Sequence, residues 1–184
     1  MVDHSDTTSS DSRLKSTTRC DVDVVVVGAG FAGMYMLHRL RSLGYSARAF
    51  EAGTGVGGTW YWNRYPGARC DVESLEYSYS FDEELQQEWE WTERYSSQPE
   101  ILAYANHVAD RFSLRDSIQF ETRVEAAKFD EGDNVWSVLT SDGQTTICRF
   151  FVMATGCLSS TSLPEFDGLE NFGGTTIHTG QWPK

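Results

Sequence analysis

Three glycines at G-x-G-x-x-G spacing, Gly28, Gly30 and Gly33, directly follow a run of four valines at residues 24–27. Because four apolar residues in a row fit a strand buried on both faces, the glycines lie where a parallel strand turns into a helix. Gly28 permits the tight turn, Gly30 lets the backbone approach a pyrophosphate, and Gly33 lets the helix pack closely on the strand. Since free N–H groups at a helix start attract phosphate, the spacing predicts a dinucleotide-binding turn.

An acidic residue, Glu51, follows 23 residues after Gly28, at the end of a second short apolar run. A carboxylate at this place accepts hydrogen bonds from an adenosine ribose and repels a 2′-phosphate, which favours FAD or NAD over NADP. A second glycine-rich stretch, residues 53–58, comes next. Flavoproteins use such a loop along the pyrophosphate and flavin edge, so the comparison with them favours FAD. The alternative is a glycine-rich turn with a purely structural role.

Composition narrows the class of protein. The chain has 184 residues, with 40% hydrophobic and 23% charged, enough for one globular domain with a core. Its formal net charge of −12 disfavours binding to nucleic acid or to an anionic membrane surface. No apolar run approaches the length of a membrane span, and the first residues contain no signal-peptide core. Four cysteines without CxxC or metal-ligand spacing indicate reduced thiols in a cytoplasmic protein and no metal site.

Hydrophobic periodicity predicts an alternation of strands and helices. The first strand is expected at residues 22–28, the first helix at 30–43 and the second strand at 46–51. Ser97 and Glu100 have the spacing of a capping box at the start of another helix. Its predicted core-facing stripe consists of Ile101, Tyr104, Ala105, Val108 and Phe112. Short β-prone segments then follow at residues 118–124, 125–130, 135–140 and 145–153.

These elements predict an α/β fold, a Rossmann-like FAD-binding domain that has a parallel sheet with helices and an inserted β-meander. Residues 1–19, rich in Ser, Thr and Asp, are expected to form a disordered tail. The cofactor-binding domain is expected to span residues 20–163. Residues 164–184, with scattered glycine and proline, are interpreted as a linker that leaves this domain.

Two longer stretches resemble the fingerprints of a known family. Residues 57–71 have the sequence GGTWYWNRYPGARCD, and residues 172–183 fit the pattern FxGxxxHxxxWP. Both are similar to motifs of type I Baeyer–Villiger monooxygenases. Residues 77–81 and 90–95 are most similar to the phenylacetone and steroid members of that family. The resemblance extends from about residue 21 to the end of the sequence.

The resemblance implies that FAD is reduced by NADPH and that O₂ then converts a small-molecule ketone into an ester or a lactone. It implies that Asp71 is the catalytic carboxylate, which orients and tunes an arginine beside the flavin, and that residues 69–71 approach the nicotinamide. Together with the glycine motif, it predicts the following cofactor-binding residues: Gly28, Gly30, Phe31, Gly33, Glu51, Gly58, Thr59, Trp60, Arg69, Cys70, Asp71, Tyr77, Val124, Ala154, Thr155 and Gly156.

Several of these residues have a simpler interpretation. Asp71 could cap or pair on the surface, Arg69 could be an exposed salt-bridge partner, and Trp60 and Tyr77 could be plain core aromatics. His178 lies in the linker fingerprint and is expected to make a hydrogen bond that sets the path between domains, rather than to catalyse.

Family members continue beyond this sequence with a second GxGxxG for NADPH and with the arginine that partners Asp71. The chain is therefore expected to hold most of an FAD-binding domain, incomplete at its C-terminus, with the NADPH site mostly elsewhere. Two alternatives to a ketone monooxygenase are a non-catalytic flavin-binding fragment and a related flavin N- or S-monooxygenase, and the two fingerprints argue against the latter. Neither the ketone nor the oligomeric state follows from the sequence.

Overall fold

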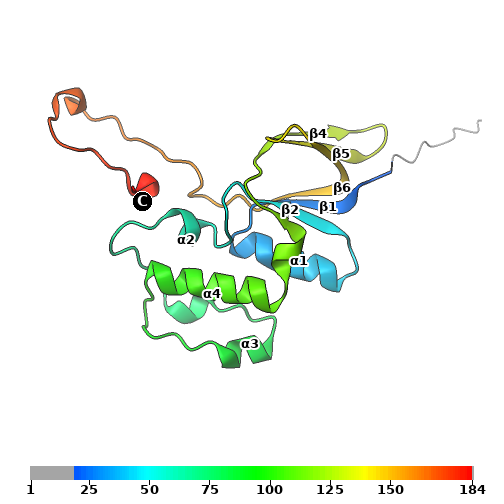
Figure 1. Ribbon diagram of the computed structural model, residues 1–184, viewed down its shortest axis with the longest axis horizontal. Coiled ribbons are helices and arrows are strands. Elements are labelled where there is room, and N and C mark those ends of the chain that lie inside the picture. The colour runs from blue at the N-terminus through cyan, green and yellow to red at the C-terminus, as the bar shows by residue number, and fades with distance from the viewer. Residues whose placement is uncertain (1–18, 184) are drawn as a thin grey trace, which may run out of the picture.

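A single six-stranded mixed sheet forms the centre of the molecule (Figure 1). The computed structural model describes residues 19–183, so the predicted disordered tail lies outside the described residues except for Arg19. The strand order is β3-β2-β1-β6-β5-β4. The strands are β1 Val22–Val27, β2 Ala47–Phe50, β3 Ile118–Gln119, β4 Val124–Asp130, β5 Val135–Thr140 and β6 Thr145–Met153.

The nine-residue strand β6 joins the parallel and antiparallel parts of this sheet. Its first half pairs antiparallel with β5, and its second half pairs parallel with β1. Cys148 stands at the changeover, opposite Trp136 on one side and Val22 on the other. The α/β fold with a β-meander is thus confirmed, and the meander continues the main sheet instead of forming a separate layer.

The strand predicted at residues 118–124 is much shorter than expected. Only Ile118 and Gln119 pair with β2. The chain then bends, because Glu121 adopts a left-handed backbone conformation with φ 52° and the Thr122 N–H donates to the carbonyl of Glu51 at 2.9 Å. This bend brings the connection to β4 alongside the end of β2.

Strand β1 is buried on both faces, as its valine run predicts. Val24 and Val26 pack towards helix α1 (Phe31–Ser42), while Val25 packs with Phe50 in a second cluster under the meander. All three valines are at most 1% exposed. Burying one such side chain stabilises a fold by about 1.5–3 kcal/mol relative to exposure, so this strand is a fixed base for the turn that follows it.

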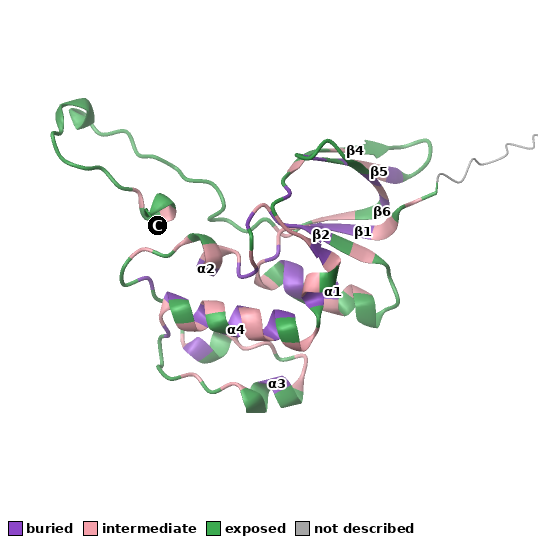
Figure 2. Ribbon diagram, viewed as in Figure 1, coloured by how far each residue is buried: buried purple, intermediate pink, exposed green. Residues whose placement is uncertain are grey.

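Helix α4 (Gln98–Arg111) lies on the α1 side of the sheet, and Figure 2 shows buried and exposed residues alternating along it. Four of the five predicted stripe residues are fully buried, and Phe112 is partly buried. The predicted capping box is wrong. Ser97 makes no side-chain cap bond, and the Glu100 carboxylate instead accepts from the Thr92 N–H at 2.7 Å. The first helical N–H, that of Gln98, already donates to the carbonyl of Ala68.

Two short helices lie between these elements: α2 spans Thr59–Trp62 and α3 spans Glu83–Glu88. After β6, residues 157–183 run away from the sheet as a mostly exposed segment (Figures 1 and 2). Each of the four cysteines is a free thiol. Within residues 19–183 no helix has both the length and the apolar character needed to cross a membrane.

Candidate cofactor site

The parallel strands end at one edge of the sheet, and the predicted glycine motifs follow these ends. Residues 28–33 continue from β1, residues 51–58 from β2 and residues 154–156 from β6. Strand β1 lies between β2, the next strand in the chain, and β6, the last one, so the order of the strands reverses beside β1. In open α/β sheets, ligands bind outside the carboxyl ends at such a reversal of strand order.

The first glycine turn leaves no room for larger side chains. A Cβ on Gly33 would lie 2.0 Å from the carbonyl oxygen of Gly28, which shows how closely helix α1 packs on the end of β1. Gly28 itself has a φ of 99°, and a Cβ there would lie 2.7 Å from the carbonyl oxygen of Ala154. These distances confirm the structural roles predicted for both glycines.

The two glycine-rich loops touch each other through their backbones. A Cβ on Gly58 would lie 2.9 Å from the Cα of Gly30, and the Gly57 N–H donates to the carbonyl of Ala29 at 3.0 Å. Among the described residues, no acceptor reaches the N–H groups of residues 31–33, and the first turn of α1 holds no acidic side chain. These donors at a helix start suit an anionic group such as a pyrophosphate.

Glu51 connects these two loops. Its carboxylate accepts from the Ala29 N–H and from the Gly53 N–H, each at 2.8 Å, and the residue is only 5% exposed. A carboxylate has about four acceptor positions, so each oxygen keeps capacity for a further donor such as a ribose hydroxyl. Glu51, the predicted ribose-binding residue, therefore also connects the two loops through these hydrogen bonds.

Three predicted aromatic residues form one cluster beside this junction. The Tyr77 ring meets Phe31 edge-on at 5.6 Å and Trp60 edge-on at 5.5 Å. Burial raises the pKa of Tyr77, and the nearby negative charge of Asp71 adds to that increase. Trp60 is buried, so it belongs to the core as well as to the candidate wall.

Asp71 is exposed beside this cluster. Among the described residues its carboxylate makes no cap and no ion pair, so the structure does not support the surface-pairing alternative for Asp71. Its neighbour Cys70 is buried. The catalytic role of Asp71 stays a prediction.

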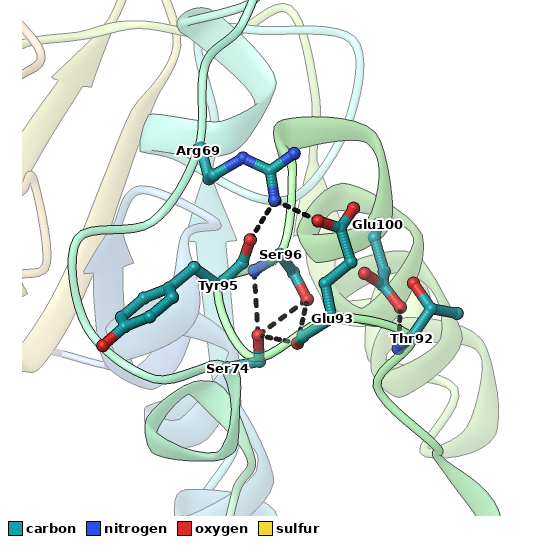
Figure 3. Close-up of polar contacts among 7 residues, drawn as sticks. All are labelled: Arg69, Ser74, Thr92, Glu93, Tyr95, Ser96 and Glu100. Atoms are coloured by element: carbon teal, nitrogen blue, oxygen red, sulfur yellow. Dashed lines mark hydrogen bonds and ion pairs between the residues drawn. The ribbon is translucent and has the colours of Figure 1, made fainter.

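The Arg69 side chain points towards residues 93–95 (Figure 3). Its guanidinium pairs with Glu93 at 2.5 Å and donates to the carbonyl of Tyr95. The exposed salt-bridge interpretation of Arg69 therefore describes this conformation, and contact of Arg69 with a cofactor stays a prediction.

The remaining predicted residues lie in two places. The Ala154 N–H donates to the carbonyl of Val27 at 2.9 Å, which places residues 154–156 beside the first glycine turn. Val124 packs with Val25 and Phe50 in the cluster under the meander, and contact of Val124 with a cofactor stays a prediction. The Nδ1 of His178 accepts from the nearby Gly180 N–H at 3.0 Å, and a role of His178 in the path between domains stays a prediction.

An open hollow of about 480 Å³ adjoins the aromatic cluster and includes Phe31 and Tyr77 in its lining. A larger one, of about 560 Å³, lies at the opposite edge of the sheet between residues 45–48 and 116–119. Because the glycine loops and Glu51 lie at the carboxyl edge, we place the candidate site there and not in the larger hollow.

Two residues that the sequence did not single out support this edge. The Gln98 side chain, 9% exposed, donates to the carbonyl of Trp60 at 2.5 Å. The Tyr61 hydroxyl contacts Thr54 in the second glycine loop. The aromatic residues of this region follow no helical or strand period, so no pattern distinguished Tyr61 from its neighbours.

Known proteins share this arrangement. Residues 26–86 match the family model described as an NAD(P)-binding Rossmann-like domain. The chain is 47% identical over 169 residues to a Baeyer–Villiger monooxygenase of Pseudooceanicola batsensis, which covers 91% of the chain and 31% of the relative. The chain is homologous to Baeyer–Villiger monooxygenases. This finding confirms the resemblance drawn from the two fingerprints.

Further relatives include an N-oxygenating enzyme. A phenazine N-monooxygenase of Lysobacter antibioticus is 49% identical over 162 residues, covering 88% of the chain and 30% of that relative. Among solved structures, a steroid monooxygenase bound to NADP has 60% identity and a TM-score of 0.81, with 88% of the chain and 31% of that protein covered. The OTEMO complex with FAD and NADP has 42% identity and a TM-score of 0.83, with 90% and 31% covered. The chain thus spans about 30% of the length of the relatives it matches.

Proposed function

We propose that this chain binds FAD and serves an oxygenase that uses NADPH and O₂ to convert ketones into esters or lactones. The observation that carries the proposal is the junction of two glycine loops with Glu51 at the carboxyl edge of the sheet. Relatives named Baeyer–Villiger monooxygenase and acetone monooxygenase support the reaction. The solved OTEMO complex, which holds FAD and NADP, supports the cofactors.

The junction fits a dinucleotide that includes a pyrophosphate. Gly30 and Gly58 keep side chains out of the place where the loops meet, and the N–H groups at the start of α1 supply donors. Glu51 would hold the adenosine ribose with the acceptor positions that Ala29 and Gly53 leave free. The absence of an acidic side chain in the first turn of α1 favours the two phosphate charges.

When bound, FAD would supply the transfer of electrons from NADPH and the activation of O₂. The chain's own residues would bind and shield this cofactor. Phe31, Trp60 and Tyr77 would exclude water from one side of it, since their rings already pack together. The exposed carboxylate of Asp71 would orient a cationic group beside the reacting atoms through its negative charge.

N-oxygenation is a second candidate reaction. The phenazine N-monooxygenase matches the chain as well as the Baeyer–Villiger enzyme does, at 49% and 47% identity. Similarity in this portion therefore does not separate oxygenation of a ketone from oxygenation of a nitrogen. A non-catalytic flavin-binding role is the third alternative. We further propose that residues 20–163 form the FAD-binding domain, that residues 164–184 lead to an NADP-binding domain, and that the protein is cytoplasmic.

Binding is tested on the chain itself by equilibrium dialysis against FAD, NAD and NADP. We expect weak but measurable binding with a preference for FAD, because the Glu51 carboxylate disfavours a 2′-phosphate. Equal affinity for all three, or no retention of FAD at millimolar concentration, contradicts the proposal.

The reaction is tested in a chimera in which residues 20–183 replace the matching portion of a cyclohexanone monooxygenase. The chimera is supplied with FAD, NADPH and O₂, and with cyclohexanone or phenazine in parallel. Lactone detected by gas chromatography supports the ketone reaction, and N-oxide detected by mass spectrometry supports the second candidate. A chimera that retains FAD and consumes NADPH without either product favours the non-catalytic alternative.

A further inference from the structure

Tyr61, on helix α2, packs against the loop formed by residues 53–57. A Cβ on Gly53 would lie 2.6 Å from the Tyr61 ring, and one on Gly55 would lie 3.1 Å from it. The ring therefore rests directly on the backbone of this loop at two alternate positions. A Cβ on Gly53 would displace the ring, and a Cβ on Gly55 would make a tight contact with it, so glycine at these positions lets the ring lie this close.

The hydroxyl of Tyr61 adds polar contacts to the same loop. It accepts from the Thr54 N–H at 3.1 Å and shares a hydrogen bond with the Thr54 hydroxyl at 2.7 Å. These bonds lower the pKa of Tyr61, as expected for a phenol oxygen that accepts hydrogen bonds. The Arg64 guanidinium lies 5.1 Å from the ring centre and donates to the Tyr61 carbonyl, which helps fix the ring in place.

The loop of residues 53–57 is hydrogen-bonded at both of its ends to residues at the carboxyl edge of the sheet. Gly53 donates to Glu51 at one end, and Gly57 donates to the carbonyl of Ala29 at the other. Tyr61 holds the middle, so the loop has three fixed points along five residues. Its shape is therefore set before any ligand arrives.

We propose that Tyr61 is a positioning residue that pre-organises residues 53–57 to receive the adenosine diphosphate half of the cofactor, an inference that rests on the proposed function. The loop begins beside Glu51, where the ribose would lie, and ends beside Gly30, where the pyrophosphate would lie. Tyr61 therefore acts on the adenosine side of the site and not on the flavin ring.

The test compares Tyr61→Phe with unsubstituted protein, using FAD, ADP and riboflavin as separate probes in equilibrium dialysis. Tyr61→Phe keeps the ring and removes only the hydroxyl. We expect the dissociation constants of FAD and ADP to rise together by about 10-fold, the scale of one to two neutral hydrogen bonds. Riboflavin, which lacks the adenosine diphosphate half, should show no change.

Tyr45→Phe is the matched control, because Tyr45 is 42% exposed and lies at the opposite edge of the sheet. Thr54→Val is a second variant that removes one partner of the same hydroxyl and should weaken FAD and ADP in the same direction. The melting temperature of each ligand-free variant distinguishes a positioning role from a purely structural one. If Tyr61 is only structural, Tyr61→Phe lowers the melting temperature and leaves the affinity for FAD and ADP at 25 °C unchanged.

Unchanged affinity of Tyr61→Phe for FAD and ADP, while the unsubstituted chain binds both, overturns the inference and leaves the proposed function standing. A loss confined to riboflavin also overturns it. If the unsubstituted chain binds neither FAD nor ADP, the proposed function fails, and the positioning role fails with it.

Discussion

Replacing Glu51 by glutamine removes one of two charge-assisted hydrogen bonds that connect the glycine loops. The carboxylate now accepts from Ala29 and Gly53, each at 2.8 Å, in a place that is 5% exposed. A carboxamide has one acceptor oxygen, so its NH₂ group would face an N–H donor instead. Because the site is buried, water cannot replace the lost acceptor.

The magnitude follows from that loss. A hydrogen bond to a charged group contributes about 1.5–3 kcal/mol, so we expect the free energy of unfolding to fall by about 2 kcal/mol. The carboxylate is also the proposed acceptor for a ribose hydroxyl. The dissociation constant for FAD should therefore rise by a further 10- to 100-fold, measured where the variant is still fully folded.

Urea unfolding followed by circular dichroism gives the first quantity, and equilibrium dialysis with FAD gives the second. Glu131→Gln makes the same chemical change in the exposed turn between β4 and β5, and should alter neither. If Glu51→Gln unfolds at the same urea concentration as the control and binds FAD equally well, the proposed role of Glu51 in connecting the two loops and binding the ribose is refuted.

Three other outcomes follow from the structure. Gly33→Ala should lower the free energy of unfolding by about 1–3 kcal/mol, because its Cβ would meet a backbone oxygen at 2.0 Å, whereas Gly173→Ala has open space and should be neutral in the same urea titration. Asp71→Ala in the cyclohexanone monooxygenase chimera should leave FAD content unchanged and lower product formation by about 10²-fold; turnover near that of the unsubstituted chimera would contradict the electrostatic role. Hydrogen bonds from Ser46 lower the pKa of Asp23, so their stabilisation is present above the unfolded pKa of about 3.9 and is lost as the pH falls through the folded value. The stability difference between Ser46→Ala and the unsubstituted chain should therefore shrink on going from pH 7 to pH 3, and a constant difference would contradict this.

Local patterns predicted the parts of the fold that depend on one element. The valine run and Gly33 specify strand, turn and helix because every requirement lies within ten residues. The capping box at Ser97 is absent because its two side-chain bonds are replaced: the Glu100 N–H donates to the Ser97 carbonyl, and the Glu100 carboxylate accepts from the Thr92 N–H. Local capping preferences do not include this contact with Thr92, which depends on how the preceding loop folds back on the helix.

In the candidate site, too, the sequence predicted what depends on one segment and missed what depends on contacts between segments. The spacing of Glu51 from Gly28 indicated a ribose ligand, but its bonds to Ala29 and Gly53 depend on how two loops meet in space. Tyr61 was missed for the same reason, since its ring is placed by the loop under it and by no repeat in the sequence. Conversely, Arg69 was assigned to the cofactor by motif position, and only the fold shows its pairing with Glu93.

The changeover at Cys148 has a consequence for the order in which the molecule forms. Strand β1 obtains its second neighbour only from β6, and the bond between Ile147 and Asp21 joins residues 126 positions apart. Contacts this distant form slowly, because a long loop must close before they contribute. During synthesis, the turn at Gly28 therefore has no Ala154 behind it until β6 has emerged. The nucleotide-binding edge is completed only when β6 pairs with β1, so acquisition of ligand would follow this pairing rather than precede it.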